Sequence, residues 1–255
     1  HRLYQCPIGR RKVLIPVSIV IVTKNEEANI EAALDSVKDA AEIVVIDSFS
    51  SDRTVEICRK YTDKVFQKEW EGYAKQKQSA VDLAEGPWVF MLDADERFTP
   101  ELKAEVINAV EEDSHDGFYA PRKNFFMDRW IRHGGWWPDY TLRLFKKHSG
   151  RVEDREVHEK VIVNGSVSHL KNPLVHYTYN SVSDYLKRMD VYSTLAAKEL
   201  KKTGVAPNVM DFLIRPPVTF IKMFFFRFGF LDGRFGLVLA VLYSYYTFLK
   251  YAKTW

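Results

Sequence analysis

Three acidic side chains follow a short apolar segment in the first half of the chain. Residues 88–92 are Trp-Val-Phe-Met-Leu, and Asp93, Asp95 and Glu96 come after them. A short apolar run bounded by turn residues is typical of a buried strand, and in open α/β sheets ligands bind beyond the carboxyl ends of the strands. Mg2+ is commonly held by one or two carboxylates together with substrate phosphates. The spacing therefore predicts a metal-assisted enzyme acting on a phosphorylated substrate, and the alternative is a solvated acidic turn.

Two earlier strands are expected to position these acids. One β-branched run, residues 42–47, ends in Asp47, and another, residues 17–23, leads into a polar loop and a stretch with helical periodicity. A third strand is expected at 64–67 and a helix at 73–84. Strands that alternate with helices at this spacing predict a parallel sheet with crossover helices. Because parallel strands end at the same edge, we expect Asp47, Asp93 and Asp95 to share one crevice.

Composition and charge narrow the class of protein. The chain has 255 residues, of which 46% are hydrophobic, and a formal net charge of +3. This length suits one α/β domain with an appended segment, and so small a charge gives no reason to expect a nucleic acid as partner. Cys6 and Cys58 provide neither a disulfide framework nor a metal-ligand spacing, which is compatible with a reducing cytoplasm. The first four residues lack the apolar core of a signal peptide, and we expect none there.

The order of the motifs is more specific than any one of them. In sequence order they are residues 17–23, Asn25-Glu26-Glu27, residues 44–48, residues 51–54, Lys77 and residues 92–96. This ordered set resembles the family 2 glycosyltransferases, which have the nucleotide-diphosphosugar transferase fold called GT-A. The resemblance implies an α/β fold, with a mixed sheet flanked by helices.

Motifs in the second half resemble one branch of this family, the lipopolysaccharide-core β-1,4-glucosyltransferases of Gram-negative bacteria. They are residues 124–126, 130–139, 142–145, 157–159, 192–197 and 250–253. One departure is Gln78, where relatives commonly carry Asn after the Lys, although Gln can still donate and accept hydrogen bonds. We accordingly expect a catalytic domain at 1–180, with a nucleotide-binding half at about 16–98 and an acceptor half at about 99–180, and a helical extension at 181–255.

The resemblance also implies which residues bind the donor, a UDP-sugar. Thr23, Asn25 and Glu26 match the loop around the base and ribose, whereas Asp47 matches the position that hydrogen-bonds uracil or ribose. Positions near the nucleotide and diphosphate are matched by Arg53 and Lys77. The full donor set is Thr23, Asn25, Glu26, Asp47, Arg53, Lys77, Asp93 and Arg143. Arg143 alternates with apolar neighbours, and it either contacts phosphate or is an outward strand residue.

A divalent cation and a general base complete the expected chemistry. Asp95, helped by Asp93 and with His158 as a further candidate ligand, is expected to hold Mg2+ or Mn2+, which would neutralise the departing diphosphate as a Lewis acid. An inverting transferase also needs a base for the acceptor hydroxyl. We favour Glu159 for this role, and Asp139 is the second candidate, with holding the neighbouring aromatic loop as its alternative role.

The loop at residues 130–137 is rich in tryptophan and glycine. Indole faces stack on the apolar faces of sugars, and glycines permit a mobile lid. Trp136, Trp137 and His133, with Trp130 beside them, are therefore the expected acceptor contacts. The alternative is that these tryptophans belong to the core.

The C-terminal extension combines basic, aromatic and apolar residues. The run at 235–249 contains no charge but is shorter than the roughly 20 residues that span a bilayer. We therefore expect interfacial helices on an anionic membrane surface. The alternative is a helical hairpin that packs on the catalytic domain or forms a homo-oligomer contact.

Together these features predict an inverting, metal-dependent transferase that moves a hexose, most simply glucose, from a UDP-sugar to a membrane-held glycolipid such as the lipopolysaccharide inner core. It would act peripherally at the cytoplasmic face of the bacterial inner membrane. The alternatives are a nucleotidyltransferase on the same fold, a transferase with a different polysaccharide or protein acceptor, and a non-catalytic membrane-surface protein. The loop at 24–27 lacks the glycines typical of nucleotidyltransferases.

Overall fold

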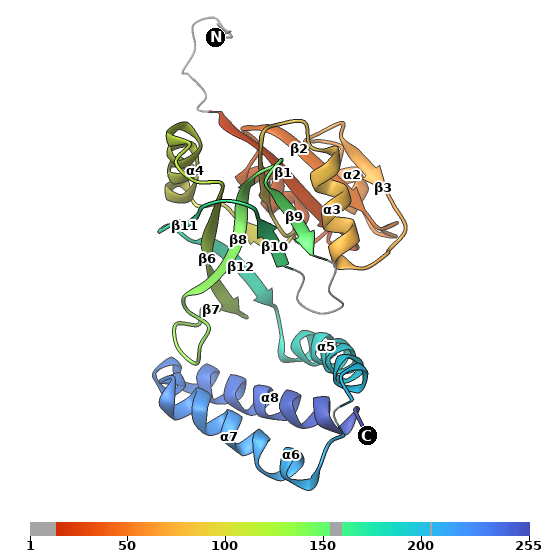
Figure 1. Cartoon of the computed structure of the whole chain (residues 1–255), viewed down its shortest axis with the longest axis vertical. Coiled ribbons are helices and arrows are strands. Elements are labelled where there is room, and N and C mark those ends of the chain that lie inside the picture. The colour runs from red at the N-terminus through yellow and green to blue at the C-terminus, as the bar shows by residue number, and fades with distance from the viewer. Residues whose placement is uncertain (1–13, 154–159, 205) are drawn as a thin grey trace, which may run out of the picture.

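The computed structural model describes residues 14–153, 160–204 and 206–255, and it places a helix-flanked sheet above a group of helices (Figure 1). The first half of the sheet is parallel, in the order β3-β2-β1-β4. These strands are β1 (Ile15–Thr23), β2 (Ala40–Asp47), β3 (Val65–Gln67) and β4 (Trp88–Met91). Thr23 pairs with Asp47, and Val20 pairs with Met91, so the three longer strands end at one edge. The predicted parallel sheet with a shared acidic edge is confirmed.

Helices cover both faces of this parallel half. They are α1 (Ile30–Ser36), α2 (Thr54–Cys58), α3 (Tyr73–Leu83) and α4 (Pro100–Glu112). Side chains of a strand alternate between its two faces. Ile19 and Ile21 of β1 accordingly pack in the cluster that includes α1, α2 and α4, whereas Val20 packs in the cluster that includes α3. Both faces of β1 are thus buried, as its continuous β-branched run predicts.

The second half of the sheet turns antiparallel at β4. Its strands are β5 (Glu96–Arg97), β6 (Gly117–Phe126), β7 (Arg129–Trp130), β8 (Asp139–Lys146), β11 (Val167–His169) and β12 (Leu174–Tyr179). β8 pairs antiparallel with both β4 and β6, while β12 runs parallel to β6. A separate hairpin pairs β9 (Gly150–Glu153) with β10 (Lys160–Val163). The sheet is therefore mixed, as expected.

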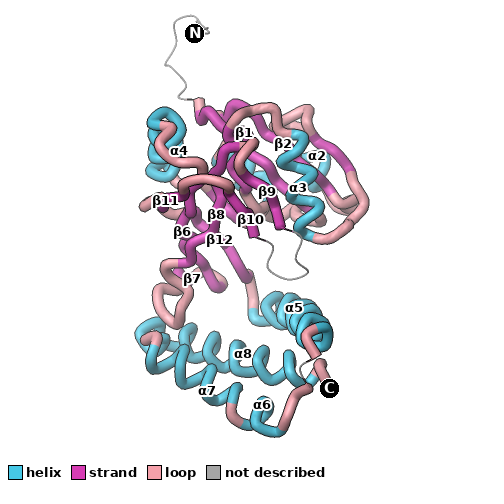
Figure 2. The backbone as a smooth tube through the Cα atoms, in the orientation of Figure 1, coloured by secondary structure: helices cyan, strands magenta, loops and turns pink. Residues whose placement is uncertain are grey.

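The C-terminal extension is helical, and its helices lie together at one end of the molecule (Figure 2). They are α5 (Val182–Lys202), α6 (Val209–Leu213), α7 (Arg215–Ile221), the π-helical turn η1 (Lys222–Phe226), the 3-10 turn η2 (Gly229–Asp232) and α8 (Gly233–Ala252). Helix α5 begins the helical extension that was expected from residue 181 onward. The apolar helical segment is longer than the charge-free run suggested, because it continues on both sides of residues 235–249.

A small core of its own joins the extension to the sheet. Phe126, Ile131 and Trp136 from the sheet side pack with Tyr185 of α5 and Leu239 of α8. Trp136 is only 6% exposed, so its ring faces are covered by protein. The expectation that Trp136 stacks on a sugar is therefore wrong, and its alternative as a core residue holds.

One buried carboxylate ties the tryptophan- and glycine-rich loop to the extension. Asp232, 7% exposed, accepts hydrogen bonds from the backbone N–H groups of Arg132 (3.2 Å) and His133 (2.8 Å), and it lies 3.3 Å from the His133 ring. The Gly134 N–H donates to the Arg227 carbonyl. A Cβ on Gly135 would lie 2.3 Å from the Arg227 guanidinium. The glycines thus permit close approach to the extension, rather than forming the free lid that we expected.

Asp232→Ala should destabilise the protein, because it leaves two partly buried backbone donors without an acceptor. The expected loss of unfolding free energy is about 2–4 kcal/mol, since hydrogen bonds to charged groups are among the stronger ones in proteins. Urea denaturation followed by circular dichroism would measure it.

Asp35→Ala is the matched control, because Asp35 forms an exposed ion pair with Lys38 on α1. Such pairs add little to stability. Equal midpoints for the two variants would refute the assigned role of Asp232.

Candidate functional site

The loops that follow β1 and β2 are tied together at the shared edge. Asn25 has a φ of +54°, and its side-chain oxygen accepts from the Ser51 N–H at 2.8 Å. Asp47 is fully buried and accepts from the Ser50 N–H at 2.8 Å. The buried Thr23 hydroxyl has no hydrogen-bond partner among the described residues. Three of the predicted donor residues thus converge on one region, and one of them keeps an unused polar atom.

Two further donor candidates lie at the rim of this region. The side chain of Glu26 accepts from Asn29 at 2.8 Å, and burial, with the charge of Asp95 adding to it, raises the pKa of its carboxyl. The Arg53 side chain is 74% exposed and lies 3.4 Å from the Glu27 carboxylate. Arg53 is therefore accessible to an anionic ligand in solvent.

Behind the loops, a buried guanidinium holds two of the acids that follow β4. Arg143 on β8 is 2% exposed and forms ion pairs with both Asp93 and Glu96. The Lys77 ammonium lies 3.2 Å from the other oxygen of Asp93. Burial would raise the pKa of Asp93, but Arg143 and Lys77 outweigh it and hold that pKa well below its usual range. Of the two orientations left open for Arg143, the inward one is correct.

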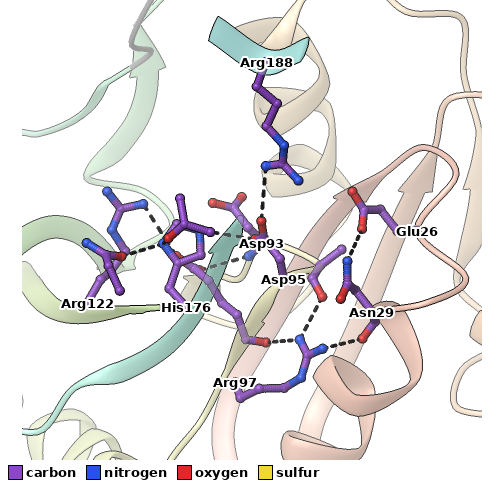
Figure 3. A network of polar contacts seen from close by, with 12 residues as sticks. Glu26, Asn29, Asp93, Asp95, Arg97, Arg122, His176 and Arg188 are labelled. Carbon is purple, nitrogen blue, oxygen red and sulfur yellow. Dashed lines mark hydrogen bonds and ion pairs between the residues drawn. The ribbon is translucent and has the colours of Figure 1, made fainter. Parts of the chain in front are cut away.

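The neighbouring acid, Asp95, faces a different set of partners (Figure 3). One carboxylate oxygen lies 3.5 Å from His176 Nε2, and the other lies 3.6 Å from Arg188 Nη1. Burial alone would raise the pKa of Asp95, but His176 and Arg188 lower it on balance. Asp95 is thus ionised near neutral pH, and both contacts are longer than good hydrogen bonds.

The tautomer of His176 follows from its neighbours. The Asn124 amide nitrogen donates to Asp139 (2.9 Å) and to the Trp136 carbonyl (3.3 Å), both of which are acceptors. The Asn124 oxygen must therefore face His176 Nδ1, 2.7 Å away, and Nδ1 carries the proton. In the neutral ring this leaves the lone pair on Nε2, directed toward Asp95. A metal-ligating histidine is commonly oriented by such a bond through its other nitrogen.

The described residues offer a partial metal site. Within residues 14–153, 160–204 and 206–255, no group of three histidine, cysteine or acidic side chains could hold a metal ion. Asp95 and His176 nevertheless supply one oxygen and one nitrogen ligand. A cation that keeps substrate phosphates and water in its shell needs no more protein ligands than these. These two residues therefore fit a divalent cation that binds together with a diphosphate.

Asp139 is engaged elsewhere. Its carboxylate lies 2.7 Å from an Arg122 nitrogen and accepts from Asn124. These contacts support the alternative role, in which Asp139 holds neighbouring protein groups in place, and they weigh against Asp139 as the general base. His158 and Glu159 lie outside the described residues.

The acceptor candidates are dispersed. Trp137 is half-buried and meets Trp130 edge-on at 5.5 Å between ring centroids, while His133 is bound to Asp232. The sequence analysis missed His176 and Arg188. The alternation on β12 places His176 on the same face as the buried Leu174, which was a usable signal, but nothing in the periodicity of α5 distinguishes Arg188.

Comparisons with known proteins agree with this geometry. The model of glycosyl transferase family 2 matches residues 18–167. The chain is 30% identical to the lipopolysaccharide core biosynthesis glycosyltransferase LpsC of Rhizobium meliloti (strain 1021), over 94% of this chain and 92% of that protein. It is 31% identical to an uncharacterized glycosyltransferase of Rickettsia bellii (strain RML369-C), over 93% of this chain and 85% of that protein.

Two solved structures share the fold. The mannosyltransferase PcManGT of Pyrobaculum calidifontis, in complex with GDP-Man and Mn2+, superposes with a TM-score of 0.51 at 15% identity, covering 94% of this chain and 86% of that one. TarS 1–349 of S. aureus, in complex with UDP-GlcNAc, has a TM-score of 0.50 at 15% identity, covering 92% and 89%. At this identity the likeness shows the fold alone, and the expected GT-A arrangement is confirmed.

The lowered pKa of Asp93 makes stability depend on pH in a defined direction. In the unfolded chain an Asp titrates near ~3.9, and the folded value lies below this. The ion pair therefore stabilises the fold above that pH, and the stabilisation is lost as the pH falls through the folded pKa. We expect the difference in unfolding free energy between the wild type and Asp93→Asn to shrink between about pH 5 and pH 3.

Urea titrations at several pH values would measure this difference. Asp35→Asn, an exposed acid on α1, should show no comparable trend. A difference between wild type and Asp93→Asn that stays constant over the same range would contradict the assignment.

Proposed function

Because the chain belongs to glycosyl transferase family 2, we propose that it transfers a hexose, with glucose as our expectation, from a UDP-sugar to a glycolipid such as the lipopolysaccharide inner core. The observation that carries the proposal is the pairing of Asp95 with His176 at the edge where the nucleotide loops converge. The LpsC relative supports the class of acceptor. The nucleotidyltransferase and the non-catalytic protein are disfavoured, because the chain is a glycosyltransferase by family.

We propose that the edge after β1 and β2 binds the nucleoside. Asp47 would accept from uracil or ribose, and the unpaired Thr23 hydroxyl and the Asn25 loop would line the same region. Lys77 and Arg53 bring positive charge to the side where the diphosphate would lie. Lys77 already neutralises Asp93, so phosphate and acid would share this cation.

The departing diphosphate is where negative charge accumulates. We propose that Asp95 and His176 hold a Mg2+ or Mn2+ ion there, which when bound acts as a Lewis acid on the phosphate oxygens. Arg188, 35% exposed and 3.6 Å from Asp95, projects from α5 over the same carboxylate. Its guanidinium would donate hydrogen bonds to the same leaving group.

For the base, we propose Glu159, in line with an inverting reaction. Asp139 is bound to Arg122 and Asn124, so its carboxylate is engaged by protein donors rather than directed toward an acceptor hydroxyl. His158 remains a candidate third ligand. Both residues lie outside the described part of the chain, so their roles rest on the family motif.

We also propose that the extension binds the cytoplasmic face of an anionic inner membrane. One helical segment, Gly229–Ala252, is long and apolar enough to cross a bilayer by length and composition, and 28% of its most apolar window is buried. One such helix is weak evidence for spanning. Apolar side chains that are more than 40% exposed include Val209, Met210, Leu213, Val218, Phe225, Phe226, Phe228, Leu231 and Val241. We name these the apolar helical face.

The exposed side-chain charges within residues 206–255 have one sign. Lys222, Arg227 and Arg234 are exposed, whereas the two acids of residues 206–255, Asp211 and Asp232, are buried. An apolar surface bordered by cations suits a bilayer with anionic headgroups. The same face could form a homo-oligomer contact, and the vesicle experiment below distinguishes membrane binding from oligomer formation.

Asp95→Asn should reduce sugar transfer at least about a hundredfold, because the leaving group loses a charged ligand in the transition state. The measurement is the transfer of radiolabelled glucose from UDP-glucose to lipopolysaccharide truncated in its outer core. EDTA should reduce wild-type transfer, and added Mn2+ should restore it.

Asp35→Asn is the matched control, and thermal melting should show that both variants are folded. Transfer by Asp95→Asn at the wild-type rate would overturn the assigned role. Release of pyrophosphate rather than UDP would indicate the nucleotidyltransferase instead.

Phe226→Glu should weaken vesicle binding about tenfold or more, because Phe226 is 76% exposed on η1 and its transfer into lipid is worth roughly 1.5–3 kcal/mol. Co-sedimentation with vesicles of phosphatidylcholine and phosphatidylglycerol would measure it. High salt should also weaken binding, because exposed charges are screened.

Leu14→Glu, immediately before β1, changes an exposed apolar residue far from the extension in sequence and should leave binding unchanged. A wild-type protein that stays in the supernatant and sediments as a dimer in the ultracentrifuge would favour the oligomer contact.

A further inference from the structure

A cavity of about 840 Å3 lies between the end of the sheet and the extension. Its lining comes from the end of β6 and the following turn, from β12, and from the first residues of α5 and α8. The residues that line it include Phe126, Met127, Tyr177, Val182, Phe235 and Val238. Pockets for small molecules have volumes of roughly 300–1,000 Å3 and mainly apolar walls. The cavity thus has the size and chemistry of a ligand site.

Three polar side chains also line the cavity. These are Asp128, Asn180 and Arg234, all of them exposed. The Arg234 guanidinium carbon lies 5.1 Å from the centroid of the Phe235 ring, within the range of a cation–π contact. A guanidinium suits a phosphate, whereas a carboxylate and an amide suit sugar hydroxyls. A cavity with apolar walls and these three polar side chains is suited to an amphiphilic ligand.

The cavity is continuous with the apolar helical face. Val238 lines it and is 37% exposed, and Val241, Tyr245 and Phe248 follow on α8 at helical spacing, each more than a third exposed. Residues three and four apart lie on the same side of a helix. An apolar chain lying along α8 would therefore meet the cavity at the N-terminal end of that helix.

One wall of the cavity belongs to the strand that carries a candidate metal ligand. Tyr177 lines the cavity, and its backbone N–H donates to the Asp95 carbonyl at 3.0 Å. His176 is the adjacent residue on β12, so its side chain and that of Tyr177 lie on opposite faces of the strand. A molecule in the cavity therefore contacts the strand that holds His176 from the face opposite to the His176 side chain.

We propose that this cavity binds the lipid chain of the phosphorylated glycolipid acceptor, with a phosphate at Arg234. The naming of the ligand as the acceptor rests on the proposed function. The cavity as a site for a single-chain phosphate amphiphile stands on the geometry alone.

Dodecyl phosphate, kept below its critical micelle concentration, is a suitable probe for calorimetric titration of the full chain. We expect saturable binding of one molecule. Val238→Trp fills the cavity and should weaken this binding at least about tenfold, as the loss of several buried methylenes implies. Arg234→Gln should weaken it by about tenfold, and dodecyl maltoside should bind to the wild type correspondingly more weakly.

Val191→Trp is the matched control, because Val191 is an exposed apolar residue of α5 that neither lines the cavity nor belongs to the apolar helical face. It should bind the probe like the wild type. Thermal melting verifies that each variant is folded. If Val238→Trp and Val191→Trp bind the probe equally well, the probe adsorbs to the helical surface and the proposal is overturned.

A second measurement separates this proposal from the proposed function. UDP binding should be unaffected by Val238→Trp, whereas the KM for the intact glycolipid should rise and the KM for the deacylated glycan should not. If Val238→Trp selectively loses dodecyl phosphate binding while the wild type transfers no sugar, the cavity is supported as a binding site and the proposed function is refuted. If the wild type transfers sugar and Val238→Trp leaves the KM for the intact glycolipid unchanged, the proposed function is supported and the cavity as acceptor site is refuted.

Discussion

The buried guanidinium of Arg143 is the interaction on which the candidate site depends. It brings Asp93 and Glu96 together where the parallel and antiparallel halves of the sheet meet, with all three charges largely withdrawn from water. A buried charge is tolerated only when it is paired. The β4–β8 pairing therefore determines where the acidic turn lies, and Asp95, between Asp93 and Glu96 in sequence, is left to face His176 and Arg188.

A second group of polar residues orients the histidine that faces Asp95. Asp139, held by Arg122, fixes the amide of Asn124, and that amide fixes the tautomer of His176. In the neutral ring, the nitrogen that faces Asp95 is consequently available as a metal ligand, whereas in the protonated ring it donates to Asp95. Residues from three strands are needed to orient the His176 ring in this way. Asp139 is one of them, which explains why we assign it a positioning role rather than that of the general base.

The C-terminal extension contacts both the tryptophan- and glycine-rich loop and the candidate site. Asp232 and Arg227 hold the loop at 131–135, and Arg188 of α5 reaches the carboxylate of Asp95. The same helices expose apolar and basic side chains and line the cavity. A surface suited to lipid, an apolar cavity and the proposed leaving-group site are thereby connected through packed helices, an arrangement suited to an acceptor that stays in a membrane.

Sequence patterns were sufficient to predict the parallel half of the sheet, the placement of Asp47 and Asp93 at one edge of it, and the helical extension, because hydrophobic periodicity and turn residues are local properties. The ordered motifs also predicted the mixed sheet and the family. The tertiary structure alone decided that Trp136 is buried, that Arg143 points inward, and that His176 and Arg188 meet Asp95. These depend on which distant segments pack together, and the burial of a side chain is not determined by its own neighbours in the chain.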